Sequence, residues 1–267
     1  MFEQIILGAI QGITEWVPVS SKTCVILAKI YFFNSHATLN ELIQYALFLH
    51  LGTFFAAVVY FWKDIVKIVN AAISPMKADE DGRQILIFLI ITTILTALGL
   101  LLTDKASGLA HGARHAKAAL MSIIAAFMIV TGFLQIKVKN SGKRTPKDLT
   151  VLDGILLGLA QAIATLPGLS RAGTTMAALS FRNFDKEHTL KLSFLMSLPV
   201  IFVGNIVKNY HAIFSFGPQW IGAITAFVVG LASIGALMQF ARRMNFGAFL
   251  IFIGAVLGIA TMFGLVD

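Results

Sequence analysis

The sequence predicts an all-α, polytopic membrane protein, with six transmembrane helices and two re-entrant helix-turn-helix pairs arranged as an inverted repeat. Three observations lead to this fold. Of the 267 residues, 57% are hydrophobic and 13% are charged, and the mean hydropathy is +0.83, which is far from the composition of soluble proteins. Six apolar runs are long and uninterrupted, and two more are broken by proline and hydroxyl residues. The two broken stretches also resemble each other.

The six uninterrupted runs are expected to cross the bilayer. About 20 residues at about 1.5 Å rise each cover a hydrocarbon core of roughly 30 Å. No cleavable signal peptide is expected, because the N-terminus lacks a basic region and a clear cleavage site. We therefore expect one integral-membrane domain over 1–267. The predicted spans are 42–62, 84–103, 117–136, 190–209, 219–240 and 246–266.

The interrupted stretches, 1–33 and 151–181, are predicted to enter the membrane and return to the same side. Each has an apolar lead-in, a proline (Pro18 or Pro167), a cluster of hydroxyls and a second helical run. Proline removes a backbone donor and disfavours helix at the preceding residue. Broken backbone within a membrane is tolerated only where protein buries it or where it lines a cavity.

The basic residues are distributed unevenly about this scheme. Most of them fall on the side that holds 63–83, 137–147, 182–191 and 242–243, whereas the opposite side holds Lys105, Arg114, Lys117 and Lys208. By the positive-inside rule, both termini of a multi-pass plasma-membrane protein then face outward. This topology accounts for the net charge of +8, so no nucleic-acid partner is expected.

An internal repeat relates the two interrupted stretches. Residues 7–13 (LGAIQGI) resemble 157–163 (LGLAQAI), and 18–22 resemble 167–171, with one residue of spacing differing between the halves. Each half, about 1–136 and 151–267, then holds one interrupted pair and three spans. Since three is odd, the second half inserts upside down. Inverted repeats of this kind bring broken helices together near the midplane.

The first interrupted stretch carries a carboxylate. Gln11 and Glu15 are four residues apart and share one helix face. An acid within a membrane is a functional candidate by default, and an acid that reaches the interface is the alternative. Ser20 and Ser21 follow Pro18. They either cap a helix or help its N-terminus to bind an anion, and these two roles are compatible.

The second interrupted stretch carries Ser170, Arg171, Thr174 and Thr175. A guanidinium at membrane depth costs at least about 2.5 kcal/mol, so Arg171 needs an anionic partner or a wet cavity. Its planar fork suits phosphate, to which it can donate two parallel hydrogen bonds. Together with Glu15, these residues predict a site for a phosphate ester or anhydride whose tail lies in lipid.

These motifs resemble a known family. Segments 11–21 and 167–175 are similar to the (E/Q)xxxE, PVSS and PGxSRSxxT motifs of the undecaprenyl-diphosphate phosphatases of the bacitracin-resistance type, and the similarity extends through 49–62 and 193–199. The resemblance implies hydrolysis of a polyprenyl diphosphate to the monophosphate, which recycles the lipid carrier for envelope polymers such as peptidoglycan. It also implies an outward-facing site and a divalent cation, Mg²⁺ or Ca²⁺. The oligomeric state, a homodimer included, stays open.

Two residues depart from the family pattern. Cys24 stands where a histidine is usual, and Ala172 stands where a serine usually follows the arginine. A thiol attacks only as a thiolate, and a lone buried cysteine is more often packing. Lys22 adds a cation that can partly substitute. The missing histidine leaves a rival function open, a non-hydrolytic transporter (flippase) of the same phospholipid, and a small-anion channel is a third alternative.

By position, Arg171 is expected to hold the phosphates with Ser170, Thr174 and Thr175 and to stabilise charge in the transition state. Ser20 and Gln11 are expected to contact the same substrate.

Glu15, helped by Gln11, is expected either to bind the metal or to act as a base toward water or Ser21. His50 is a further candidate for proton transfer, because an imidazole within a span is unusual. A structural histidine bonded to a neighbouring helix is the alternative.

Overall fold

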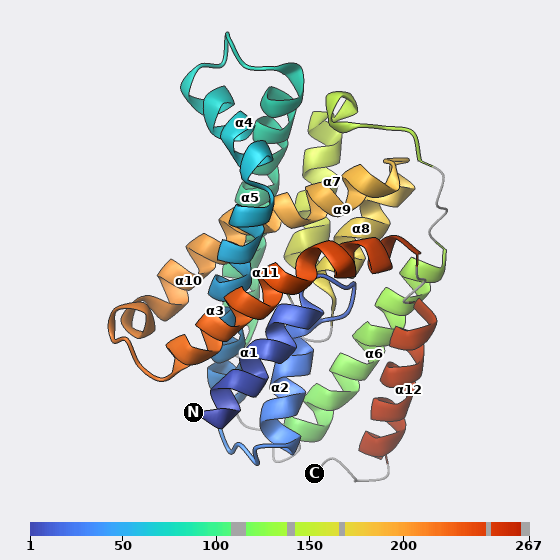
Figure 1. Cartoon of the computed structure of the whole chain (residues 1–267). Coiled ribbons are helices and arrows are strands. Elements are labelled where there is room, and N and C mark those ends of the chain that lie inside the picture. Colours follow the sequence, from blue (N-terminus) through green and yellow to red (C-terminus); the bar gives the residue numbers. More distant parts are fainter. Residues whose placement is uncertain (108–115, 138–141, 166–168, 244–246, 263–267) are drawn as a thin grey trace.

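The computed structural model describes residues 1–107, 116–137, 142–165, 169–243 and 247–262, and these residues form an all-helical structure (Figure 1). The first half contains α1 (Phe2–Thr14), α2 (Ser21–Tyr31), α3 (Leu39–Tyr60), α4 (Trp62–Ile73), α5 (Glu80–Ser107) and α6 (Ala116–Ile136). A short 3-10 helix at Pro146–Asp148 precedes the second half, which contains α7 (Val151–Ile163), α8 (Arg171–Phe181), α9 (Lys186–Leu195), α10 (Ser197–Phe214), α11 (Gln219–Arg243) and α12 (Gly247–Met262). The helix-breaking Pro167 lies outside the described residues.

Several of these helices suit a membrane. Within the described residues, four stretches are long and apolar enough to cross one: Leu39–Tyr60, Glu80–Leu101, Lys186–Phe214 and Gln219–Phe240. Shorter apolar helices, Ser122–Leu134 and Leu250–Met262, lie in the two other predicted spans. The prediction of an all-α, multi-pass membrane protein is therefore confirmed at this level.

The predicted span 190–209 is not one continuous helix. α9 ends at Leu195 and α10 begins at Ser197, with Met196 between them. Pro199 lacks the N–H that would bond to the carbonyl of Leu195, and its ring crowds that carbonyl. The break brings the main chain of Met196 and the side chain of Ser197 next to the site described below.

Each interrupted stretch contains two helices, α1 and α2 in the first and α7 and α8 in the second. Ser20 caps α2 by accepting a hydrogen bond from the Thr23 N–H, and Ser170 caps α8 by accepting one from the Gly173 N–H. The caps therefore match Ser20 with Ser170, whereas the sequence alignment through the prolines matched Lys22 with Arg171. That register was wrong by one residue, because the hydroxyl that bonds the first free N–H groups decides where a helix begins.

Small residues let neighbouring helices approach closely, as is common in membrane proteins. α1 packs along α11, where a Cβ on Gly8 would lie 2.3 Å from the carbonyl oxygen of Gly222. α7 packs along α5 in a similar way, and a Cβ on Gly158 would lie 2.9 Å from Leu95. The first helix of each half is thus held by a long helix of the other half.

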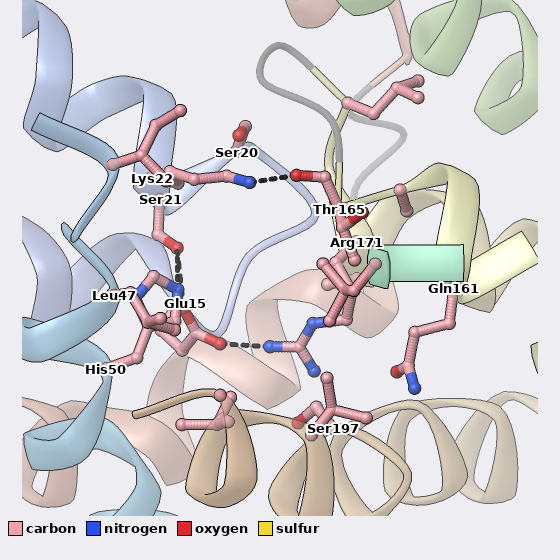
Figure 2. A pocket seen from close by; sticks show the side chains of 18 of the residues that line it. Glu15, Ser20, Ser21, Lys22, Leu47, His50, Gln161, Thr165, Arg171 and Ser197 are labelled. Carbon is pink, nitrogen blue, oxygen red and sulfur yellow. Dashed lines mark hydrogen bonds and ion pairs between the residues drawn. The ribbon is translucent and has the colours of Figure 1, made fainter. Parts of the chain in front are cut away.

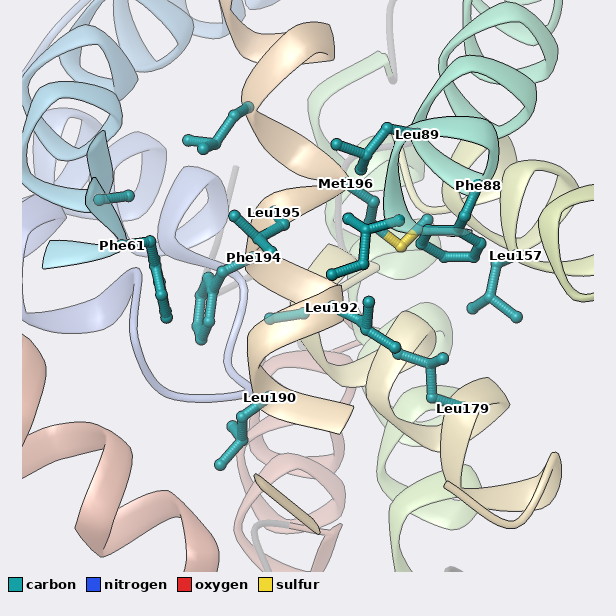
Figure 3. Packing of buried hydrophobic residues seen from close by; sticks show 14 of the residues in the cluster. Phe61, Phe88, Leu89, Leu157, Leu179, Leu190, Leu192, Phe194, Leu195 and Met196 are labelled. Atoms are coloured by element: carbon teal, nitrogen blue, oxygen red, sulfur yellow. The ribbon is translucent and has the colours of Figure 1, made fainter. Parts of the chain in front are cut away.

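The largest buried apolar cluster surrounds α9 (Figure 3). Phe194, Leu195 and Met196 pack there against side chains from α5, α7 and α8, among them Phe88 and Leu157. The cluster includes residues of both broken pairs. It packs the end of α9 next to Arg171, which donates to the carbonyl of Ser193.

Candidate active site

Glu15 is the carboxylate on which the site converges. It follows the last residue of α1, and only 4% of its surface is exposed. Gln11 Nε2 donates to Glu15 Oε2 at 2.9 Å, and Ser21 Oγ donates to the same oxygen at 2.7 Å. The predicted common face of Gln11 and Glu15 is therefore present, and the turn between α1 and α2 brings Ser21 onto it.

Arg171, the first residue of α8, supplies the opposite charge. Its guanidinium forms an ion pair with Glu15 Oε1 across the site (Figure 2). It also donates to the carbonyl of Ser193 at 3.3 Å and lies 5.9 Å from the centre of the Phe194 ring. The anionic partner that Arg171 required is thus Glu15, which comes from the other half of the chain.

His50 of α3 faces the same oxygen and the same hydroxyl. Its Nδ1 lies 2.6 Å from the carbonyl oxygen of Ala46. A carbonyl only accepts, so we assign the proton of the neutral ring to Nδ1, which leaves Nε2 as an acceptor. Nε2 lies 3.4 Å from Ser21 Oγ and 3.3 Å from Glu15 Oε2. His50 is therefore positioned to take a proton from Ser21.

A cavity of about 160 Å³ opens beside these groups. Its polar lining comprises Glu15, Ser20, Ser21, Lys22, His50, Gln161, Thr165, Arg171, Ser197 and Lys208, and most of the remaining wall is apolar. Among the lining residues, three are basic side chains (Lys22, Arg171 and Lys208) and one is a carboxylate (Glu15). Such a cavity suits an anionic head group that is attached to an apolar chain.

Gln11, Ser170, Thr174 and Thr175, which were predicted to contact substrate, do not line the cavity. Ser170 caps α8 as described above. Thr175 Oγ1 donates to the carbonyl of Arg171 at 2.8 Å and shares a 2.7 Å hydrogen bond with Ser193 Oγ. Thr174 Oγ1 is buried without a hydrogen-bond partner among the described atoms. Of these residues, Thr175 supports Arg171 directly, because its hydroxyl bonds back to the Arg171 carbonyl within the helix.

Gln161, Thr165 and Lys208 are among the polar lining residues that sequence reasoning missed. Gln161 donates through Nε2 to Thr96 Oγ1 at 3.1 Å and to the Met196 carbonyl at 3.2 Å, and its Oε1 is buried without a partner among the described atoms. The repeat that matched Gln11 with Gln161 was the signal that could have found it. Lys208 was counted only as a marker of topology. Thr165 accepts a hydrogen bond from Lys22 through its main-chain carbonyl, which no side-chain motif can indicate.

The two departures from the family pattern lie in different environments. Ala172 lines the cavity, whereas Cys24 does not. Cys24 lies in the first turn of α2, where its N–H donates to the carbonyl of Ser20 at 2.9 Å. The packing interpretation of Cys24 therefore fits the structure better than a nucleophilic thiol does.

The donor set bears on the divalent cation. Within the described chain, no group of three or more His, Cys, Asp and Glu side chains is suited to holding a metal ion. Mg²⁺, however, is usually held by one or two carboxylates together with phosphates of the substrate. Glu15 offers one carboxylate, and Gln161, which also lines the cavity, has a buried Oε1 without a hydrogen-bond partner among the described atoms. The residues fit a cation that is shared with a phosphate, but they do not form a closed metal site.

Comparison with known proteins gives consistent matches over almost the whole chain. The family model described as "Bacitracin resistance protein BacA" matches residues 4–260. The chain is similar to the undecaprenyl-diphosphatase of Methanococcoides burtonii, with 35% identity over 98% of both chains. It is also similar to the protein of that name from Pseudarthrobacter chlorophenolicus, with 31% identity over 100% of this chain and 99% of the relative. The chain therefore belongs to the BacA family of bacitracin resistance proteins.

Proposed function

We propose that this protein is an integral-membrane phosphatase, which hydrolyses undecaprenyl diphosphate to undecaprenyl monophosphate and inorganic phosphate. This reaction recycles the lipid carrier for cell-envelope polymers. The observation that carries the proposal is the convergence of Glu15, Ser21, His50 and Arg171 at one end of a cationic cavity with apolar walls. Relatives of full length bear the name of this activity.

In the proposed reaction, Ser21 Oγ attacks the terminal phosphorus. Its proton passes to Glu15 Oε2, which already accepts its hydrogen bond at 2.7 Å, or to the adjacent Nε2 of His50. A bond forms between Oγ and phosphorus as the bond from phosphorus to the bridging oxygen breaks, and the prenyl monophosphate leaves with the electron pair. Water then attacks the phosphoserine, which releases inorganic phosphate and returns the proton to Ser21. Trapping of a phosphoserine by rapid acid quench separates this route from direct attack by water.

Arg171 holds the terminal phosphate in this proposal. A guanidinium has five N–H donors, and the hydrogen bonds that the described chain makes to Glu15 and Ser193 use only part of them. The free N–H groups at the start of α8 add a positive dipole end on the same side. Both groups stabilise the charge that develops on the equatorial oxygens.

A divalent cation is part of the proposal, with Glu15 and Gln161 Oε1 as its protein ligands. When bound, it supplies charge neutralisation to the phosphate oxygens. The residues above hold and position the substrate whether the cation enters before the lipid or together with it.

The membrane arrangement is also a proposal: six spans, two re-entrant pairs and inverted repeats at about 1–136 and 151–267 in the plasma membrane, with both termini outside. The exchanged packing supports the repeat, because α1 lies on α11 while α7 lies on α5. Labelling with an impermeant maleimide tests the orientation in a Cys24→Ala background. A cysteine at exposed position Asn34 is expected to react from outside, and one at exposed position Lys77 is not.

Phosphate release by purified protein in detergent, with a long-chain prenyl diphosphate, tests the activity. Turnover is expected for the natural chain and for the surface control Glu80→Gln, and its loss is expected in Glu15→Gln. Lipid scrambling in vesicles without phosphate release would instead establish the transporter. Phosphate flux through liposomes would establish an anion channel.

A further inference from the structure

The cavity continues from the Glu15 end along two helix faces. On α3, Ile43, Leu47 and His50 are spaced by four and three residues. On α10, Ser197, Ile201, Gly204 and Lys208 are spaced by four, three and four residues, and all seven residues line the cavity. Such spacing keeps side chains on one helix face. Lys208 lies about 16 Å along α10 from Ser197, so the cavity has a buried catalytic end and a second end marked by Lys208.

The part of α10 that carries Lys208 is fixed to α3 by two buried amides. Asn205 Nδ2 donates to the Leu47 carbonyl at 2.9 Å, and Asn209 Nδ2 donates to the Gln44 carbonyl at 3.1 Å. Asn209 also donates to Asn205 Oδ1 at 2.9 Å. Satisfied buried networks of this kind rigidify the elements that they join. Lys208 is therefore held at a fixed place opposite α3.

The positive charge of the cavity divides into two parts. Arg171 is matched by Glu15. Lys22 donates to the Thr165 carbonyl, which carries no net charge, and Lys208 lines the same cavity, where two ammonium groups of like charge disfavour each other. An anion between two ammonium groups removes such repulsion and gains charge-assisted hydrogen bonds. The second end of the cavity is therefore complementary to a second anionic group.

We infer that Lys22 and Lys208 form a second phosphate subsite, which holds the phosphate attached to the prenyl chain while Arg171 holds the terminal phosphate. The inference rests on the proposed function and adds a basis for specificity. A diphosphate ester presents one phosphate to Arg171 and the other to the two lysines, all three of which line the same cavity, whereas a monophosphate presents only one. The lysines also neutralise the charge that the prenyl monophosphate gains when the bridging bond breaks. Apolar side chains between the two helix faces receive the first part of the prenyl chain.

Steady-state kinetics of Lys208→Gln tests the subsite, with farnesyl diphosphate as substrate. A charge-assisted hydrogen bond contributes about 1.5–3 kcal/mol, so we expect KM to rise by roughly 10-fold to 100-fold. Inhibition by farnesyl monophosphate and by inorganic pyrophosphate is expected to weaken by a similar factor. Inhibition by inorganic phosphate, which needs only the Arg171 end, is expected to change little.

Matched variants separate the subsite from general effects. Lys147→Gln removes an exposed lysine and is expected to leave KM unchanged, while Lys208→Arg is expected to stay near the natural KM because it keeps the charge. Lys22→Gln is expected to follow Lys208→Gln. An unchanged KM and unchanged inhibition by monophosphate in Lys208→Gln would overturn the inference.

Failure of the proposed function gives a different result. If the natural chain releases no phosphate, equilibrium binding of pyrophosphate and of farnesyl monophosphate still tests the lysines. Weaker binding of both ligands by Lys208→Gln, but not by Lys147→Gln, then supports the subsite. Equal binding by the natural chain and both variants rules it out.

Discussion

The two broken helix pairs share a backbone plan and differ in their chemistry. α1 and α7 each have 13 residues, and α2 and α8 each have 11. In both pairs a glutamine near the end of the first helix is buried, and a serine caps the second helix. Because the two pairs share this backbone geometry, differences in their chemistry are attributed to their side chains.

The difference lies in three matched positions. Where the first pair has Glu15, Ser21 and Lys22, the second has Thr165, Arg171 and Ala172. Two contacts then cross between the pairs, from Glu15 to Arg171 and from Lys22 to the Thr165 carbonyl. The repeated backbone brings the two sequences together, and the divergence of the side chains gives one pair the acid and the nucleophile and the other the guanidinium.

The largest effect is expected from breaking the pair that joins the two halves. Glu15→Gln removes a base and a phosphate-site charge, so kcat is expected to fall by about 10³-fold or more. Arg171→Gln leaves a buried carboxylate unpaired, and it is expected to lower stability by about 3–5 kcal/mol as well as abolish turnover. Phosphate release and thermal unfolding in detergent measure these effects.

The exchanged double variant sharpens the comparison. Glu15→Arg combined with Arg171→Glu is expected to recover part of the lost stability without recovering activity, because Ser21 stays beside position 15. Recovery of turnover would mean that the two pairs are chemically interchangeable. Arg83→Gln, on an exposed arginine, serves as the control.

His50 belongs to neither broken helix pair. Its replacement tests whether the residues of the two pairs are enough for full turnover. His50→Gln keeps a polar group but removes the proton acceptor, so kcat is expected to fall by about 10²-fold. Activity of the natural chain is expected to decline toward low pH as the ring protonates, and this acid limb is expected to flatten in the variant. A pH profile of kcat measures both effects. An unaltered profile would assign His50 a structural role only.

The two glutamines separate cation binding from support of Glu15. Chelation with EDTA is expected to abolish turnover, and added Mg²⁺ or Ca²⁺ is expected to restore it. Gln161→Leu is expected to need more cation for half-maximal activity, because it removes the Oε1 that is proposed as a cation ligand. Gln11→Leu is expected to lower kcat with an unchanged cation requirement. A cation titration of each variant measures the difference.

Smaller effects on stability and turnover are expected from replacing Thr175, which supports Arg171 from the protein interior. Thr175→Val removes the hydrogen bond to Ser193, and it is expected to cost about 1 kcal/mol of stability while turnover falls only modestly. The free energy of unfolding in a denaturant series measures this cost. An effect on KM as large as that of Arg171→Gln would instead make Thr175 a direct phosphate ligand.

The smallest effect is expected for Cys24→His, which introduces the residue that the family resemblance implies at this position. Cys24 does not line the cavity and His50 already faces Ser21, so turnover is expected to stay near that of the natural chain. A large rise would mean that the natural site is impaired. Phosphate release under saturating substrate measures the outcome.

The sequence predicted the helical membrane fold and several of the side chains that meet at Glu15, because both depend on composition and local motifs. An arginine within an apolar segment required an acid, and Glu15 was the candidate in the matching stretch. The register of the repeat was wrong, because the serine caps rather than the prolines decide where α2 and α8 begin.

Other features depended on contacts that no motif carries. The sequence did not predict the break at Met196, because the long apolar run favoured one continuous helix, whereas Pro199 favoured a break. Thr174 and Thr175 were grouped with Arg171 by proximity in sequence, yet their hydroxyls are turned to the protein interior. Lys22 bonds to a main-chain carbonyl from a distant segment, and Lys208 reaches the cavity from α10.

The ion pair between Glu15 and Arg171 joins the two halves of the chain, which has a consequence for the order of assembly during translation. The first half leaves the ribosome with its acid and its hydroxyl but without the guanidinium that completes the site. α9 contacts Arg171 through the Ser193 carbonyl, and α10 lines the cavity through Ser197 and Lys208. The nascent chain is therefore expected to lack a complete substrate site until most of the second half has been inserted. Two separately expressed halves would accordingly be silent alone and active only after they meet in the bilayer.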